Sequence, residues 1–421
     1  MNKVKSISKI LKGTAGIFAL GMAFSFLFNW AITKVMSQED VGFFQYFISI
    51  ITLAMVIIPL GYQSLAQREA ISLGRLALNK FSKQAVITIL STAILFSCIW
   101  YYGVTRLNWV KGLNNFNGLR AALLVIPIYS LNTFFKSVLQ SQNKVYQSII
   151  PDVLIRPALL LLSLLILPFL GLGINPETLL YLLSCILICS LIYAIVNSFK
   201  EITIGDFNNQ PKWFKQALLL LPIGLLYTIN ERIDIVMISK MLGPIDNAIY
   251  GVAFKFAAFS GFGIVILNQV LVPQYAKHFK EKGNVNELQK IIKPNVRKSF
   301  FLSSLVLLIL LLFGENLLSL FGKLTNEYTS GFTTIIILSF GQLFNVAVGS
   351  VGYILTMAKL EKYVFIGLGL GILSNLILNS LLVPKFGIQG AAIATSTSMI
   401  LWNVVMLIFV IRKTKINPTI L

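Results

Sequence analysis

Four charged residues stand inside two segments that are otherwise apolar enough to cross a lipid bilayer. They are Glu231, Arg232 and Asp234, which lie close together in the chain, and Lys255 in the following segment. An ionisable side chain at the centre of a membrane-spanning helix costs roughly 2.5–3.5 kcal/mol on insertion scales, so it normally faces a partner or a watery cavity. These residues therefore indicate a polar path through a membrane protein.

The turn expected at Gly243-Pro244 lies about midway between Arg232 and Lys255. Because each residue adds about 1.5 Å to the length of an α-helix, an antiparallel pair of helices would hold both cations at about the same depth. A structural alternative stays open, in which Glu231 or Asp234 neutralises one of the cations and the ion pair locks the two helices together.

Arg156 is a further cation inside an apolar segment, and it immediately precedes Pro157. We expect it nearer the inner side of the membrane. Its long side chain can extend to the inner lipid headgroups, or it can pair with Asp152 one helical turn earlier. A third interpretation makes Arg156 part of the substrate path.

The composition is that of an integral membrane protein. The chain has 421 residues, of which 56% are hydrophobic and only 12% charged, and its mean hydropathy is +0.81. Since about 20 apolar residues span the hydrocarbon of a bilayer, we predict an all-α polytopic protein with about 12 transmembrane helices. The predicted spans are 14–35, 43–66, 85–104, 119–139, 149–171, 178–198, 215–240, 247–272, 300–321, 331–357, 363–383 and 389–411.

Lysine and arginine set the expected orientation. With both termini in the cytoplasm, about 25 basic residues fall on inner tails and loops and about 7 on outer ones, as the positive-inside rule requires. The densest basic stretch, 277–298, is then an inner segment, which we interpret as a solvated amphipathic linker. The formal net charge of +20 needs no nucleic acid to explain it.

The two halves of the chain resemble each other. Three sets of matching residues occur in the same order in both halves, which indicates a duplication with parallel repeats. We therefore expect two six-helix lobes, 1–206 and 207–421. The first matched set is Ile32, Thr33, Lys34, Val35, Met36, Asp40, Phe44 and Gln63 with Ile238, Ser239, Lys240, Met241, Leu242, Asp246, Tyr250 and Gln269.

The repeat makes the charged residues more informative. At the spacing of the first matched set, Glu231, Arg232, Asp234 and Lys255 correspond to uncharged residues of the first half. The duplicated scaffold alone therefore does not account for the charges. The corresponding residues are Ser25, Phe26, Phe28 and Ser49.

Several chemistries can be set aside. The chain contains no nucleotide-binding glycine loop of the P-loop pattern, and its single histidine, His278, is expected in an inner loop. We expect no cofactor, no metal site and no enzymatic activity. The three cysteines all fall within predicted helices, and we interpret them as buried small apolar residues.

Seven segments of the chain have the pattern of a known family; they are 42–47, 60–68, 221–222, 231–240, 250–255, 272–273 and 383–392. These segments resemble the polysaccharide transporters of the multidrug/oligosaccharidyl-lipid/polysaccharide (MOP) exporter superfamily, and among them the O-antigen flippases of the Wzx type. The resemblance extends over nearly the whole chain and supports the superfamily more strongly than the substrate.

The resemblance implies two six-helix lobes that enclose a cationic cavity in the plasma membrane of a bacterium. The implied substrate is an oligosaccharide repeat unit on undecaprenyl pyrophosphate, moved from the inner to the outer leaflet. On this interpretation Arg232 and Lys255 bind the diphosphate, and Arg156 assists on the inner side. Glu231 and Asp234 balance the charge or take up a coupling ion. Membrane lipids, a polysaccharide polymerase and its chain-length machinery are the implied partners.

Two rival functions remain. A transporter of the related MATE type would export small amphiphilic molecules with the same alternating access, and it would favour acidic residues in an apolar cavity. Here the intramembrane charges balance or are positive once Arg156 is included, which favours an anionic substrate. A structural scaffold of an envelope-assembly complex would leave the intramembrane charges without a task.

Overall fold

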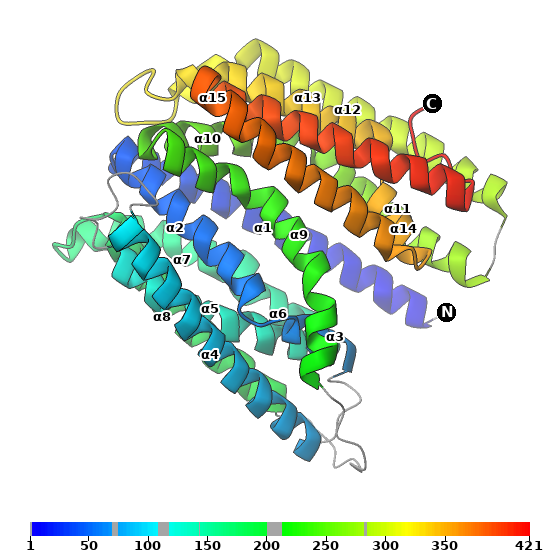
Figure 1. The fold of residues 1–421 in the computed structure, drawn as a ribbon, viewed down its shortest axis with the longest axis horizontal. Helices are drawn as coiled ribbons and strands as arrows, with labels where there is room; N and C mark the ends of the chain where they lie inside the picture. Colours follow the sequence, from blue (N-terminus) through cyan, green and yellow to red (C-terminus); the bar gives the residue numbers. More distant parts are fainter. Residues whose placement is uncertain (1, 70–74, 108–117, 143, 200–212, 282–283) are drawn as a thin grey trace. The chain divides into compact units, whose positions relative to one another are not determined.

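The computed structural model describes residues 2–69, 75–107, 118–142, 144–199, 213–281 and 284–421, and these residues are helical with no strand among them (Figure 1). The chain folds as two compact units, Met1–Thr228 and Ile229–Leu421, called here the N-terminal and the C-terminal unit. The predicted lobe boundary at 206 lies outside the described residues. The predicted all-α polytopic fold is confirmed.

The N-terminal unit holds the helices of the first six predicted spans. Its central helix α5 packs against α8, α4 and α2, and α1 packs against α7. The elements are α1 (Asn2–Val35), α2 (Gln38–Ile57), α3 (Tyr62–Glu69), α4 (Arg75–Leu107), α5 (Gly118–Ser141), α6 (Val145–Ile150), the π-helical turn η3 (Pro151–Ile155), α7 (Arg156–Phe169) and α8 (Pro176–Phe199).

The division between the units falls within α9, so the C-terminal unit holds the second part of α9, from Ile229, and the helices of the last five spans. Helix α13 packs against α12, α10 and α15. The elements are α9 (Trp213–Met241), α10 (Pro244–Ser260), α11 (Phe262–Glu281), α12 (Val285–Ser319), the 3-10 turn η4 (Thr329–Gly331), α13 (Phe332–Val348), α14 (Val351–Met357) and α15 (Glu361–Thr414).

Local sequence explains where the first hairpin of each unit turns. Helix α2 begins after Ser37, whose hydroxyl accepts a hydrogen bond from the backbone N–H of Asp40 at 3.1 Å, a cap that satisfies one of the free donors at a helix start. In the C-terminal unit Gly243 takes a left-handed φ of 114°, and Pro244 then occupies the first turn of α10. These two starts belong to the matched segments of the repeat.

Several predicted spans are broken helices. A non-helical turn separates α2 from α3 at Leu60 and Gly61, and another separates α13 from α14 at Gly349. Helix α15 contains two predicted spans. They are separated only by a kink at Gly387, where φ is 57° and ψ is −138°. Counting each broken helix once and each half of α15 once gives the twelve expected passes among the described residues.

Nine of the described helices are long and apolar enough to cross a membrane by length and composition. Helix α9 is not among them, although it contains the predicted span that carries Glu231, Arg232 and Asp234. Helices α10 and α11 are not among them either: the turn at Gly261 ends α10 after 17 residues, and α11 has 20 residues with a polar, charged end.

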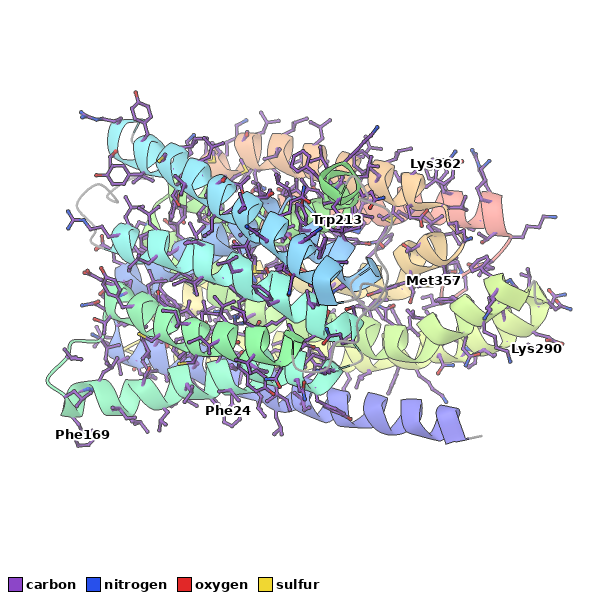
Figure 2. The ribbon with its side chains drawn as sticks, turned by 90° about the horizontal axis from the view of Figure 1, so that it is seen from below. Phe24, Phe169, Trp213, Lys290, Met357 and Lys362 are labelled. Atoms are coloured by element: carbon purple, nitrogen blue, oxygen red, sulfur yellow. The ribbon has the colours of Figure 1, made fainter. Side chains whose placement is uncertain are left out.

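Helix α12 begins earlier than its predicted span. Its first turns form an amphipathic helix, in which Leu288 and Ile292 are buried while Lys290 and Arg297 are exposed. Figure 2 shows Lys290 on the part of α12 that projects from one end of the C-terminal unit. The basic stretch predicted as a linker is therefore partly helical, because its apolar residues recur at helical spacing.

Large apolar side chains also cover the outer faces of the helices, as expected for surfaces in contact with lipid. Phe169 is 91% exposed at the end of α7, where Figure 2 shows its side chain pointing outward. The interpretation of the cysteines as buried residues is wrong, since Cys98, Cys185 and Cys189 are exposed. An apolar helix in a membrane has no need to bury a small apolar residue, because lipid is as apolar as the interior.

Candidate functional site

The two cations of the C-terminal unit come from neighbouring helices. Arg232 lies on α9 and Lys255 on α10, and both are partly buried. The turn at Gly243 and Pro244 joins these two helices, as the predicted hairpin requires. The Nε atom of Arg232 is buried and has no hydrogen-bond partner in the described part of the chain. Two cations on consecutive helices, with an unbonded Nε–H on Arg232, can bind an anionic group.

The two acids of α9 have different surroundings. Glu231 is exposed, whereas Asp234 is only 2% exposed. Residues three apart on a helix lie on neighbouring parts of its surface, so the two acids differ in burial more than in direction. Their roles are therefore separable.

Asp234 is held by four neutral donors, called here the Asp234 cluster. Its Oδ1 accepts hydrogen bonds from the side-chain amides of Asn375 at 3.0 Å and Asn379 at 2.9 Å. Its Oδ2 accepts from the hydroxyls of Thr395 at 2.6 Å and Tyr250 at 3.2 Å. A carboxylate is an acceptor with room for about four donors, so the cluster satisfies Asp234 without a cation.

The hydrogen-bond partners of Asp234 in the described part of the chain are all neutral groups. Neither Arg232 nor Lys255 is among the partners of Asp234 in the described part of the chain. The cations and the buried acid are two separate polar features of the same unit.

The partners of Asp234 come from two other helices of the unit. Asn375 and Asn379 lie one turn apart on the first half of α15, and Thr395 lies on the second half. The break at Gly387 turns the chain so that both halves reach the same carboxylate. Tyr250 comes from α10, where it also stacks on Phe254 with ring centroids 6.3 Å apart.

The Asp234 cluster offers several oxygen atoms in a buried setting. The Oδ1 of Asn379 is buried and has no hydrogen-bond partner in the described residues, and the Oδ1 of Asn375 accepts from the amide of Asn379. Carboxylate, amide and hydroxyl oxygens are the ligands that hard cations prefer. The same carboxylate could instead take up a proton.

Arg156 lies in the N-terminal unit, in a second polar group. Its guanidinium donates a hydrogen bond to the hydroxyl of Tyr129 and lies over that ring, with Cζ 5.2 Å from the centroid. The predicted pairing with Asp152 is loose, because the closest approach, Nη1 to Oδ1, is 3.8 Å. The firm ion partner of Asp152 is Lys136 on α5.

Sequence reasoning missed Lys136 and the partners of Asp234. Lys136 lies inside the predicted span 119–139, where an intramembrane cation is itself a signal. Asn375 and Asn379 lie four residues apart in an apolar span, so they share a helix face. This pattern in the sequence could have indicated a polar cluster. The carboxylate that they bind is far away in the sequence, so their partner could not be read from spacing.

The described side chains include no group of three or more His, Cys, Asp and Glu residues that could hold a metal ion together. The site therefore consists of a cation pair, the Asp234 cluster and the Arg156 group. Each of these lies within one unit.

No protein-family model matches the chain. The chain is 24% identical over 382 residues to the capsular polysaccharide biosynthesis protein CapF of Staphylococcus aureus, a match that covers 89% of this chain and 91% of that protein. Among solved structures, the lipid II flippase MurJ in an inward closed conformation matches with a TM-score of 0.75 at 17% identity, covering 94% of this chain and 86% of that one.

An inward-facing multidrug resistance MATE family transporter of the MOP superfamily matches with a TM-score of 0.74 at 14% identity, covering 92% of this chain and 93% of that one. At these identities the structural likeness establishes the fold. The chain has the MOP fold, and it is a multi-pass membrane protein. The predicted resemblance is confirmed in two respects: the chain is similar in sequence to a capsular polysaccharide biosynthesis protein, and it shares its fold with MurJ and with a MATE transporter of the MOP superfamily.

Proposed function

We propose that this protein, which has the MOP fold, is a flippase for lipid-linked oligosaccharides. It would move repeat units attached to undecaprenyl pyrophosphate from the inner to the outer leaflet of a bacterial plasma membrane by alternating access. The similarity to a capsular polysaccharide biosynthesis protein supports a glycan substrate. The fold shared with a lipid II flippase supports a lipid-linked one.

The placement of Arg232 and Lys255 on two consecutive helices, both partly buried, carries this proposal. A diphosphate and its sugars cannot cross hydrocarbon without polar groups that replace their hydration. Two cations on adjacent helices supply these groups, and Arg232 has a donor without a partner in the described part of the chain. Arg156 would assist the diphosphate from the N-terminal unit, where its guanidinium lies beside Tyr129.

Asp234 would take up the coupling ion, a proton or a monovalent cation, and Glu231 would balance the charge near the cations. The burial of Asp234 among neutral donors supports this division of tasks. An ion that binds one conformation better than the other shifts the equilibrium between them. Binding at Asp234 could in this way bias the protein toward one side of the membrane.

A MATE-like exporter of small amphiphilic molecules is the second candidate. The buried carboxylate favours it, because an acid in an apolar setting suits a cationic substrate as well as a coupling ion. The cation pair argues against it, since a cationic drug would meet like charges at Arg232 and Lys255. Either function fits a protein of the plasma membrane with both termini in the cytoplasm. The glycan function adds a polysaccharide polymerase and its chain-length machinery as partners.

The first test is display of surface glycan in cells that lack the gene and carry a rescuing copy. We expect Arg232→Ala and Lys255→Ala to abolish display and to leave lipid-linked repeat units inside the cell, because each variant removes one of two cations. Arg232→Lys and Lys255→Arg should retain part of the activity. Lys240→Ala, at the exposed end of α9, is the matched control and should display glycan normally.

Protein levels must be equal by blot for the comparison to count. Normal display in cells without the gene, and without a second flippase, would contradict glycan export. Full rescue by both alanine variants would show that the cation pair does not bind the substrate.

A further inference from the structure

A group of charged residues in the N-terminal unit has a role that the cation pair does not explain. Tyr129 and Lys136 lie on α5, Asp152 lies on η3, and Arg156 begins α7. These four residues are called here the Lys136 cluster. It contains two cations and one acid, so it has one positive charge in excess.

No other acid offsets this charge among the described side chains of the unit. The charged groups that act on Lys136 are Asp152 and Arg156. The other described acids stand in the first turns of α2 and α8, at the ends of their helices; they are Glu39, Asp40 and Glu177. A net charge within membrane-spanning helices is costly unless it meets a partner.

The geometry divides the tasks within the cluster. Asp152 uses its Oδ2 to pair with Lys136, whose side chain is almost completely buried. The Oδ1 of Asp152 has no hydrogen-bond partner in the described chain and is 3.8 Å from Arg156. The guanidinium donates one hydrogen bond, to Tyr129, and its side chain is 25% exposed. A guanidinium has five N–H donors in a planar fork, so Arg156 has donors left for a ligand.

The backbone holds this arrangement in an unusual turn. The segment Pro151–Ile155 is π-helical, and the N–H of Arg156 bonds to the carbonyl of Pro151. Pro157 has no N–H for the carbonyl of Val153 four residues earlier, and Gly21 of α1 packs against that carbonyl, where a Cβ would come within 2.1 Å. Single π-helical turns within α-helices are frequent at functional sites.

We propose that the Lys136 cluster is a binding site for the phosphate groups of a membrane lipid. Arg156 contacts the phosphate with its free donors. Lys136 and Asp152 are positioning residues: Lys136 keeps the carboxylate away from the guanidinium, and Asp152 reduces the positive charge so that a bound phosphate can leave. A carrier site needs binding that is favourable yet weak enough for release.

If the ligand is the diphosphate of the lipid-linked sugar, this proposal rests on the proposed flippase function. The phosphate of an anionic phospholipid presents the same chemistry. The two sources are distinguished by testing undecaprenyl diphosphate and phosphatidylglycerol separately on the purified full-length protein in detergent, by native mass spectrometry. Undecaprenol and phosphatidylcholine serve as lipids without a phosphate and without net charge, respectively.

The net charge of the Lys136 cluster predicts how tightly each variant binds a phosphate lipid. Arg156→Ala should weaken binding of the phosphate lipid by at least about tenfold, as expected for loss of a charge-assisted contact. Lys136→Met should weaken it similarly, because Asp152 then turns to Arg156. Asp152→Asn should strengthen binding by about tenfold and slow release, since the cluster gains a charge.

The double variant Lys136→Met/Asp152→Asn restores one excess charge, so its affinity should return to within about threefold of wild type. It also removes both members of a buried ion pair, which is tolerated better than removal of one member. Arg120→Ala, exposed at the start of α5, is the control and should bind normally. Undecaprenol binding should be unchanged in every variant.

The pattern of affinities decides the proposal. If it appears with undecaprenyl diphosphate, the source is the carrier lipid, and if it appears with phosphatidylglycerol, the source is the membrane; both support an anion site. If folded Asp152→Asn protein, monodisperse on a sizing column, binds no more tightly than wild type, the cluster is a structural ion pair and the proposal fails. The readout is independent of glycan display, so it stands or falls separately from the flippase function.

Discussion

At the scale of single residues, the buried charged groups differ in how far their hydrogen-bonding capacity is satisfied. Asp234 is surrounded by donors that satisfy it, whereas Arg232 has a buried donor with no partner in the described chain. A satisfied group can stay in one state, and an unsatisfied buried donor is costly until a ligand arrives. This contrast supports the proposed division of tasks, in which Asp234 takes up an ion and Arg232 binds the substrate.

Asp234→Asn tests the coupling role at this scale. An ion that binds only the native state stabilises it, by about 2.7 kcal/mol at a concentration 100 times its Kd. We expect the midpoint of thermal unfolding of the purified wild-type protein to rise with sodium, in place of choline at equal ionic strength, or with decreasing pH. The variant has similar size and lacks the charge, so it should lose that rise.

Asn403→Ala is a suitable control for this measurement, because Asn403 is buried on the second half of α15 but bonds to the carbonyl of Met399 instead of Asp234. It should keep the ion-dependent rise even if its midpoint is lower. An equal rise in wild type and Asp234→Asn would place the ion elsewhere, and no rise with either ion would remove the coupling role.

At the scale of helices, breaks position the polar residues. Helix α15 brings Asn375 and Thr395 to one carboxylate because it bends at Gly387, and η3 brings Asp152 and Arg156 to α5 through a π-helical turn. Hydropathy predicted where these helices cross the membrane. Hydropathy could not predict in which direction the side chains beside each break point, since that direction depends on φ and ψ at single residues.

Gly387→Ala tests the bend directly. A side chain there meets no atom within 4 Å, so the cost of the substitution comes from the φ of 57° and ψ of −138°. We expect a loss of about 1–3 kcal/mol, as for other residues held in rarely populated backbone regions. The measurement is the midpoint of thermal unfolding of the purified protein.

Gly369→Ala is the matched control in the same helix, because it also meets no atom within 4 Å but lies in regular helix. It should leave the midpoint unchanged or raise it, since alanine favours a helix over glycine by about 0.5–1 kcal/mol. Equal effects of the two variants would mean that the bend at Gly387 carries no backbone strain.

At the scale of the whole molecule, most of the helical architecture could be predicted from the sequence. The hydrogen-bond partners of its buried polar residues could not. The spans, the all-α class and the hairpin of Arg232 and Lys255 came from hydropathy and helix geometry. The bonds of Asn379 and Thr395 to Asp234 join positions far apart in the chain, and they depend on packing that no periodicity encodes. Lys136 was missed because a single charge in a long apolar span hardly changes its hydropathy.

The predicted duplication of the two halves does not extend to their intramembrane charges. The residues that correspond to Asp234 and Lys255 in the first half, Phe28 and Ser49, are buried and uncharged. The N-terminal unit has its charges elsewhere, in the Lys136 cluster on other helices. Each unit therefore has a polar group of its own.

Orientation in the membrane is the last prediction, and it concerns the whole chain. The positive-inside rule places Lys290 in the cytoplasm and Lys323, in the loop after α12, outside. The three native cysteines are first replaced by serine. A membrane-impermeant maleimide should then label Lys323→Cys in intact spheroplasts, and Lys290→Cys only after the membrane is opened. Both side chains are exposed, so accessibility alone does not separate them. The opposite labelling would put Arg156 nearer the outer leaflet, where it could not receive a substrate made in the cytoplasm.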